Sequence, residues 1–459
     1  MGRIYCLLWL AAIVVLPLPS HAKDSWLNLP GGSESTIHEP VFNDQAFVYE
    51  VGRKHKTSVV LVHGLGQNGA KDWELLIPVL AKRFHVLTFD LPGFGRSDKG
   101  NNLYSPATYT EFLRFVTQKF IGRQFIIVGH SMGGAIAAHY AASYPKDVAK
   151  LVLVDAAGIL HKVAFEKHLA GSAVDSRVPE LYDTKSSDVR SIINFFIDAS
   201  EYINLGPHLV LNTPPLRKTL LGGDPLKISA LSLVLEDFSA IIPRIKQPTL
   251  LIWGERDPVS PVRTAVVLQQ VLARADTRII PGIGHSPMRE ATESFNQHVL
   301  DFVSGKLVIS GNQKEKPQAQ KKEGPLTCNE QSNLVVDGSY TTIEIVGCKD
   351  ITLRNVFADK LIVRDSIIDL ENVVIEGADV GIVANNADIR ITNGKIVADI
   401  AIQADESRFD IAGTNLVGHN FLVKGNLPSN FVFSLVYAES PGQKRFLHDF
   451  IQVSTFKSL

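Results

Sequence analysis

Short runs of apolar residues alternate with glycine-rich turns and amphipathic stretches up to about residue 305. Runs of this kind, rich in Val, Ile and Leu, are typical of parallel strands buried on both faces. The predicted strands are 57–62, 84–89, 125–128, 148–154, 249–253 and 277–280. The predicted helices are 105–120, 134–144, 260–273 and 291–303. Alternation of strands and helices predicts an α/β fold with a mainly parallel sheet and helices on both faces.

This alternation is interrupted between about residue 158 and residue 243. No strand run occurs there, and the pattern indicates several helices joined by loops. After the last predicted helix, residues 306–327 are polar and charged, which is typical of a linker. The first folded unit is therefore predicted to cover residues 23–305.

A repeat of about 20 residues follows the linker. The segments LIVRDS, GIVANN and AIQADE begin at residues 361, 381 and 401. A second set begins at residues 351, 373, 389 and 409, with less even spacing. Two short strands per repeat, with Asn, Asp and Gly at the corners, predict an all-β domain over 328–459, a right-handed parallel β-helix. An ordinary β-sandwich is the alternative.

The N-terminus has the pattern of a signal peptide over residues 1–22. Arg3 precedes a short apolar core from Leu7 to Leu16, and Ser20-His21-Ala22 resembles a cleavage site. A retained membrane anchor is the competing interpretation, but the core is short and is followed by prolines. No other stretch is apolar enough to span a membrane. The pattern predicts an exported protein, periplasmic or secreted.

Composition limits the classes of partner. The chain has 459 residues, enough for two or three domains, and 45% of them are hydrophobic. A formal net charge of -1 gives no reason to expect a nucleic-acid partner.

Two cysteines, Cys328 and Cys348, follow the predicted signal peptide. An even number of cysteines in an exported chain predicts a disulfide, with two free thiols as the alternative. The two positions are one repeat apart. Equivalent positions on adjacent coils lie about 4.8 Å apart, within the Cα separation that a disulfide spans.

The stretch GHSMGG, from Gly129 to Gly134, lies between a predicted strand and a predicted helix. This is the G-x-S-x-G motif in the context its chemistry requires, because the sharp turn exposes the hydroxyl of Ser131. Glycines two residues on either side leave room for the strained turn. The N-terminus of the helix favours negative charge that develops near Ser131, the predicted nucleophile.

A general base and a group that orients it are also needed for acyl transfer. His285, in a glycine-flanked loop after the last predicted strand, is the predicted base. His63 and His130 are competitors, but we expect both to be structural.

Asp257 follows the strand before that of His285 and is the predicted orienting carboxylate, with Asp155 as the alternative. Two backbone N–H groups, of Leu65 and Met132, are the predicted oxyanion hole. No cofactor or metal is predicted.

Five motifs, in this order, resemble those of the α/β-hydrolase fold superfamily. They are HGLG at 63, DLPGFGRSD at 90, GHSMGG at 129, WGERDPVSP at 253 and GIGHSP at 282. The resemblance implies that residues 158–243 form a cap over the active site. A serine, rather than an aspartate, at position 131 excludes dehalogenases and epoxide hydrolases. Esterase, lipase, thioesterase, amidase, carbon–carbon hydrolase and cofactor-free perhydrolase activities remain.

These observations predict an exported serine hydrolase that cleaves a carboxylic ester, either a small molecule or a lipid-like ester. The β-helix is expected to bind a polymer or a cell-envelope partner and so to localise the enzyme. The alternative is a non-catalytic scaffold or binding protein of the envelope.

Overall fold

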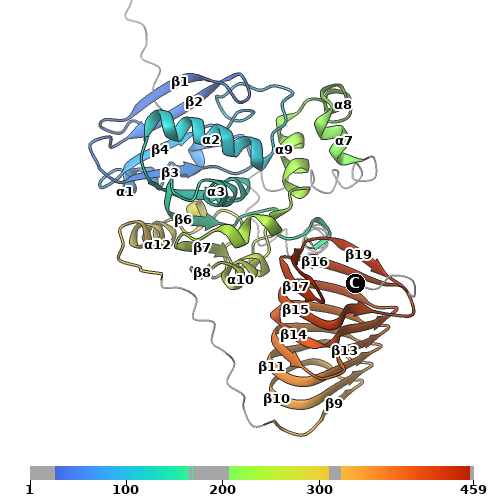
Figure 1. Ribbon diagram of the computed structural model, residues 1–459. Coiled ribbons are helices and arrows are strands. Elements are labelled where there is room, and N and C mark those ends of the chain that lie inside the picture. Colours follow the sequence, from blue (N-terminus) through green and yellow to red (C-terminus); the bar gives the residue numbers. More distant parts are fainter. Residues whose placement is uncertain (1–25, 165–167, 169–205, 310–321, 455–459) are drawn as a thin grey trace, which may run out of the picture.

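The computed structural model describes residues 26–164, 168, 206–309 and 322–454. Figure 1 shows a sheet flanked by helices and, beside it, a stack of β-coils formed by the C-terminal part of the chain. The predicted signal peptide and most of the predicted linker lie outside the described residues. None of the helices among the described residues has the length and apolarity needed to cross a bilayer.

An eight-stranded sheet forms the first unit, in the order β1-β2-β4-β3-β5-β6-β7-β8. Its strands are β1 (Ser33–Glu39), β2 (Asp44–Val51), β3 (Ser58–Val62), β4 (His85–Phe89), β5 (Phe125–His130), β6 (Val148–Val154), β7 (Thr249–Gly254) and β8 (Ala275–Ile280). Strands β3 to β8 pair in parallel, and β1 and β2 add an antiparallel edge. The predicted α/β sheet is confirmed.

Helices cover both faces of this sheet, as the buried strands require. On one face lie α2 (Pro106–Phe120), α3 (Met132–Ser143) and α10 (Val262–Val271), and on the other α1 (Ile77–Leu80) and α12 (Thr292–Val303). Strand β3 shows why two hydrophobic clusters form. Val60 and Val62 belong to the first cluster, whereas Val59 and Leu61 belong to the second, because successive side chains of a strand point to opposite faces.

The described part of the predicted cap is helical. It contains α7 (Pro207–Asn212), α8 (Pro214–Leu220), α9 (Pro225–Val234) and the 3-10 helices η3 (Phe238–Ala240) and η4 (Ile242–Arg244). The buried Arg217 donates through Nη2 to the carbonyl oxygen of Asn101 at 2.9 Å, and the Asn101 amide donates to that of Pro214 at 2.8 Å. These bonds hold α8 to the loop that follows β4. The domain boundaries themselves stay a prediction.

The C-terminal unit is a stack of parallel β-coils closed into a ring. Its strands are β9 (Leu326–Asn329), β10 (Ser332–Val346), β11 (Lys349–Arg364), β12 (Ile367–Glu376), β13 (Val380–Asn385), β14 (Asp388–Asp405), β15 (Arg408–Lys424), β16 (Ser429–Ser434), β17 (Val436–Ser440), β18 (Gln443–Leu447) and β19 (Phe450–Val453). Antiparallel pairs β16–β19 and β17–β18 end the stack.

The β-helix has three strand segments per coil, so the predicted two per repeat were wrong. The parallel pairings between successive coils form three columns of stacked strands. One column pairs Leu361 with Ile382, a second pairs Ile351 with Ile368, and a third pairs Phe357 with Val374. The segment that begins at residue 373 belongs to the third column and not to that of residue 351. Corner residues with positive φ bend the chain between faces, and the pairing register skips them; examples are Asn355 (55°), Asn372 (54°) and Asn393 (58°).

The two cysteines do not occupy equivalent positions, contrary to the expectation from the repeat. In the strand register, Cys328 pairs with Ile345, and Cys348 follows three residues later at a turn. The turn nevertheless returns Cys348 to its partner, and their Sγ atoms lie 2.6 Å apart, unbonded. The disulfide therefore stays a prediction. The two thiols are already adjacent, so its formation does not require one coil to move relative to the next.

Candidate active site

Ser131 occupies the sharp turn between β5 and α3. Its backbone has φ 53° and ψ -121°, a conformation that non-glycine residues rarely adopt. A Cβ on Gly129 would lie 2.2 Å from the carbonyl oxygen of Gly133, and one on Gly133 would lie 2.3 Å from that of Val62. Both neighbouring glycines are therefore required for the turn to pack against the sheet.

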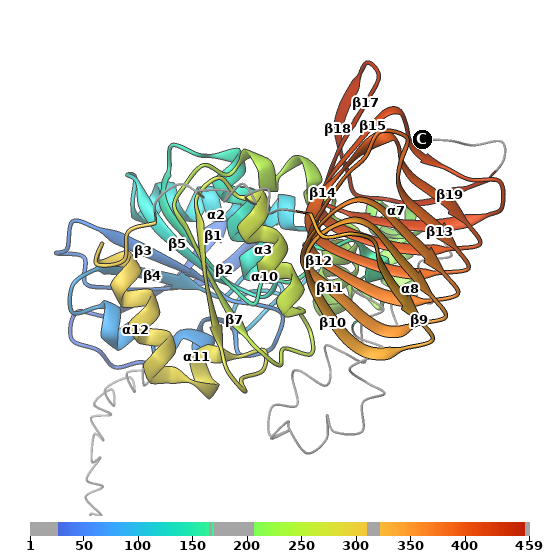
Figure 2. The same cartoon turned by 90° about the horizontal axis from the view of Figure 1, so that it is seen from below.

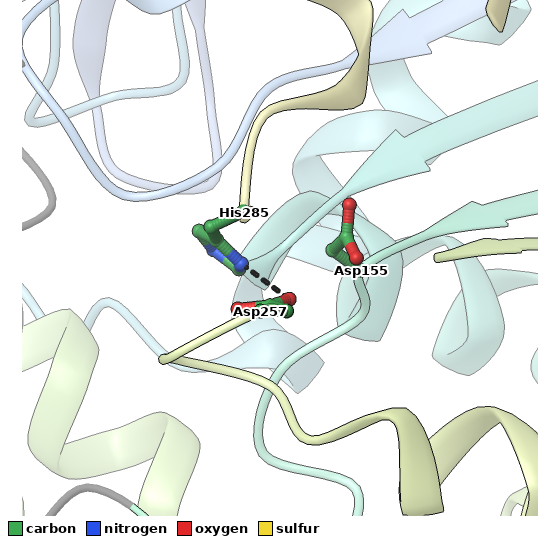
Figure 3. A group of neighbouring side chains, drawn as sticks. All are labelled: Asp155, Asp257 and His285. Carbon is green, nitrogen blue, oxygen red and sulfur yellow. Dashed lines mark hydrogen bonds and ion pairs between the residues drawn. The ribbon is translucent and has the colours of Figure 1, made fainter. Parts of the chain in front are cut away.

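A hydrogen-bonded chain joins the predicted nucleophile, base and acid. His285 lies in the loop between β8 and α11 (Pro287–Glu290), and its Nε2 is 3.0 Å from Ser131 Oγ. Its Nδ1 is 2.8 Å from Asp257 Oδ2, the bond drawn in Figure 3. All three residues are buried. The structure thus brings together side chains that are far apart in the sequence. Ser131 and His285 are separated by 154 residues, and Asp257 and His285 by 28.

Asp257 is held by the backbone as well as by His285. Its Oδ1 accepts the N–H groups of Val259 at 2.8 Å and Ser260 at 3.0 Å. Burial by itself raises the pKa of Asp257, but the His285 imidazole and the N–H donors outweigh it and hold the pKa below its usual value. Asp257 is accordingly ionised and oriented toward His285 Nδ1.

Asp155 lies beside this pair at the end of β6, with φ 42° (Figure 3). Its Oδ1 accepts the Gly254 N–H at 2.9 Å, while its buried Oδ2 has no hydrogen-bond partner among the residues that the structure describes. Burial and the Asp257 carboxylate raise the pKa of Asp155 well above its usual value. Two adjacent buried carboxyls cannot both ionise readily, so Asp155 holds its proton more tightly than Asp257 does.

Donor atoms of Asp155, Asp257 and His285 lie within 4.8 Å of one another, a separation that could also suit a metal ion. However, His285 Nδ1 and Asp257 Oδ2 are bonded to each other, and Asp257 Oδ1 accepts two backbone donors. These hydrogen bonds account for the close approach of Asp257 and His285.

The two competing histidines bind backbone groups. His63 Nε2 accepts the Leu91 N–H at 2.8 Å, and its Nδ1–H donates to the carbonyl oxygen of Gly64 at 2.7 Å. His130 Nε2–H donates to the carbonyl oxygen of His285 at 2.7 Å. Burial, together with His285, lowers the pKa of His130 to about 3, so its ring is neutral. His130 therefore holds the loop of the predicted base.

The two predicted oxyanion donors lie on segments that meet at Ser131. Met132 is the first residue of α3, and Leu65 follows Gly64 in the loop after β3. A Cβ on Gly64 would lie 2.8 Å from the Ser131 Cβ, so the loop backbone passes directly beside the nucleophile. This approach is what an oxyanion hole needs; the assignment of Leu65 and Met132 stays a prediction.

Two further residues shape the site and were not predicted. Asp90 Oδ1 accepts the Ala70 N–H at 2.7 Å, and its Oδ2 accepts the Arg96 N–H at 2.8 Å, which ties the loops after β3 and β4 together. His168 Nε2–H donates to the carbonyl oxygen of Asp257 at 3.1 Å. The position of Asp90 at the end of a predicted strand was a usable signal, whereas nothing in the sequence distinguishes His168.

Comparison with known proteins gives a consistent result. The family model described as alpha/beta hydrolase fold matches residues 57–184. Lipase 3 of Moraxella sp. (strain TA144) is 30% identical over 249 residues, which cover 54% of this chain and 77% of the relative. Lipase 1 of Psychrobacter immobilis is 29% identical over 263 residues, covering 57% and 81% respectively. Human monoacylglycerol lipase ABHD6 is 27% identical over 312 residues, covering 63% and 87%.

Proposed function

The chain belongs to the α/β-hydrolase family, and from this premise we propose that it is an exported serine esterase that uses Ser131, His285 and Asp257 on lipid-like carboxylic esters. The observation that carries the proposal is the continuous hydrogen-bonded chain from Ser131 Oγ through His285 to Asp257, at 3.0 and 2.8 Å. The lipases among its relatives support an ester of a fatty acid as the substrate class.

The proposed reaction begins at Ser131. His285 Nε2 takes the hydroxyl proton as Oγ bonds to the acyl carbon, and the carbonyl electron pair moves to the oxygen. Backbone N–H groups of Leu65 and Met132 stabilise this oxyanion. When the oxyanion collapses, the ester C–O bond breaks and His285 gives the proton to the departing alcohol. Water then attacks the acyl-enzyme by the same sequence and releases the acid.

Electrostatics favour this direction of proton transfer. The ionised Asp257 stabilises the imidazolium that forms on His285, and it fixes the tautomer whose Nε2 is free to accept a proton. The N-terminus of α3 adds positive potential where the oxyanion develops.

Export and the role of the β-helix belong to the same proposal. The signal-peptide pattern and the two adjacent thiols support a protein that matures in an oxidising compartment. We propose that the β-helix also binds a polymer or an envelope partner. Thioester, amide or carbon–carbon cleavage on the same triad is the alternative chemistry.

The test is a comparison of Ser131→Ala with Ser143→Ala, which changes a serine at the other end of α3. We expect Ser131→Ala to reduce kcat/KM for p-nitrophenyl butyrate by about 10⁴-fold or more and to abolish fluorophosphonate labelling. Ser143→Ala should retain both. A folded Ser131→Ala protein that keeps the wild-type rate would contradict the proposal.

A further inference from the structure

Helix α10 is docked on the β-helix mainly through Arg263, and Asn393 of β14 adds a hydrogen bond to the carbonyl oxygen of Val266 at 3.1 Å. Arg263 donates through Nη1 to Asp410 Oδ2 at 2.7 Å and through Nε to Thr392 Oγ1 at 2.8 Å. Its Nη2 reaches the carbonyl oxygens of Ile391 at 2.8 Å and Asp410 at 3.1 Å. The Arg263 and Asp410 side chains are each only 14% exposed. Four hydrogen bonds at this degree of burial fix the helix to β14 and β15 far more firmly than a surface ion pair would.

Apolar packing continues this contact. Ala412, Val432 and Leu435 of the β-helix belong to the same buried cluster as α3 and α10 of the first unit. Gly413 has φ 63°, and a Cβ there would lie 2.3 Å from Asn393 Oδ1 and 3.2 Å from Val267 Cγ1 of α10, so the glycine leaves room for both side chains at the contact. Both views show α10 beside these coils, whereas in Figure 1 the coil with β9 lies at the end remote from the sheet.

The last coils also contact the two ends of the cap. At the entrance, the His161 N–H donates to Ser434 Oγ at 2.9 Å, and the His161 ring lies edge-on to that of His448, with centroids 5.4 Å apart. At the exit, β18 lies against η3, which begins with the buried Phe238.

Two of these contacts, the one at the entrance of the cap and the one at α10, lie close in sequence to residues that bond Asp257. Seven residues after His161, His168 donates to the carbonyl oxygen of Asp257. Three residues before Arg263, Ser260 donates its N–H to Asp257 Oδ1 and its hydroxyl to the carbonyl oxygen of Ala156 at 2.7 Å. The β-helix is therefore connected to the Asp257 loop through both α10 and the entrance of the cap.

We infer that the C-terminal coils of the β-helix are a positioning element for the cap and for α10, and that they help to set which acyl chains the site accepts. This inference rests on the proposed esterase activity. A module attached only by a linker would leave selectivity unchanged, whereas these coils contact α10, His161 and η3 and so act on the site through those described elements.

The test uses the full chain with two conservative variants. Ser434→Ala removes the acceptor of the His161 N–H, and Asp410→Asn removes the charge opposite Arg263 while keeping its shape. Arg364→Ala is the matched control, because Arg364 also pairs with a carboxylate of the neighbouring coil, Glu344, but lies among the first coils of the stack. The measured quantity is the ratio of kcat/KM for p-nitrophenyl decanoate to that for p-nitrophenyl acetate.

We expect at least one interface variant to change this ratio by about threefold or more, with wild-type circular dichroism, and Arg364→Ala to leave it unchanged. Loss of stability alone would reduce both rates together and leave the ratio constant. If the wild type is active and both folded interface variants have the same kcat/KM ratio as the wild type, this inference is overturned but the proposed function is not. A wild type that cleaves neither ester and resists fluorophosphonate overturns the proposed function and the inference with it.

Discussion

Replacement of Asp257 by Asn tests which carboxylate orients His285. Oδ1 of Asp257 accepts two backbone N–H groups, so in the variant the amide carbonyl must occupy that position. The amide NH₂ then faces His285 Nδ1 and donates to it. The ring must carry its proton on Nε2, where it cannot accept the proton of Ser131.

The expected loss follows from this change of tautomer. An orienting aspartate replaced by asparagine typically reduces kcat by about 10⁴-fold, equivalent to about 5 kcal/mol of transition-state stabilisation. Asp155→Asn is the matched control. Asp155 bonds the Gly254 N–H, and burial raises its pKa, so an amide preserves its shape and resembles its protonated form; we expect activity within about tenfold of wild type.

The assay is steady-state hydrolysis of p-nitrophenyl butyrate at pH 8, with circular dichroism to confirm folding. Wild-type kcat in Asp257→Asn would refute the tautomer argument. A loss of about 10⁴-fold in Asp155→Asn instead would identify Asp155 as the orienting acid.

Two further predictions concern stability. Burial raises the pKa of Asp155 in the folded protein above its unfolded value near 3.8. The free energy of unfolding is therefore highest below the unfolded pKa, and it falls by about 1.4 kcal/mol per pH unit as the pH rises from there toward the folded pKa. Asp155→Asn should remove this slope in urea unfolding between pH 5 and pH 7, and equal slopes in the two proteins would contradict the assignment. A disulfide between Cys328 and Cys348 would close a loop of about 20 residues and add about 3 kcal/mol. Reductant should therefore lower the Tm of wild type but not of Cys328→Ser, and a wild-type Tm indifferent to reductant would exclude the bond.

The sequence was most informative where backbone geometry demands particular residues. Gly129 and Gly133 are needed because any side chain there would collide with backbone atoms. The sharp turn at Ser131 could therefore be located from the sequence alone. Strand β1 could not be predicted, because six of its seven residues, SESTIHE, are polar and three of them are exposed at the sheet edge.

The third face of the β-helix escaped prediction for a similar reason. In its register column the outward position changes from Phe357 and Val374 to Lys395 and Asn415. Only the inward position stays apolar and buried, as Ala358, Ile375, Ile396 and Leu416, so the recurring signal is a single residue per coil. Docking of α10 was equally hidden, because Arg263 bonds groups 128 to 147 residues away and resembles any other helix arginine in the sequence.

The hydrophobic cluster shared by the two units has a consequence for the order of folding. Ala412, Val432 and Leu435 complete a cluster whose first members, such as Ala46, are more than 350 residues earlier in the chain. During synthesis or passage across a membrane, the N-terminal sheet must wait for the last coils before this apolar surface is covered. The interval is a period of exposure to aggregation and proteolysis, and a chaperone that recognises apolar surface would have its binding site there.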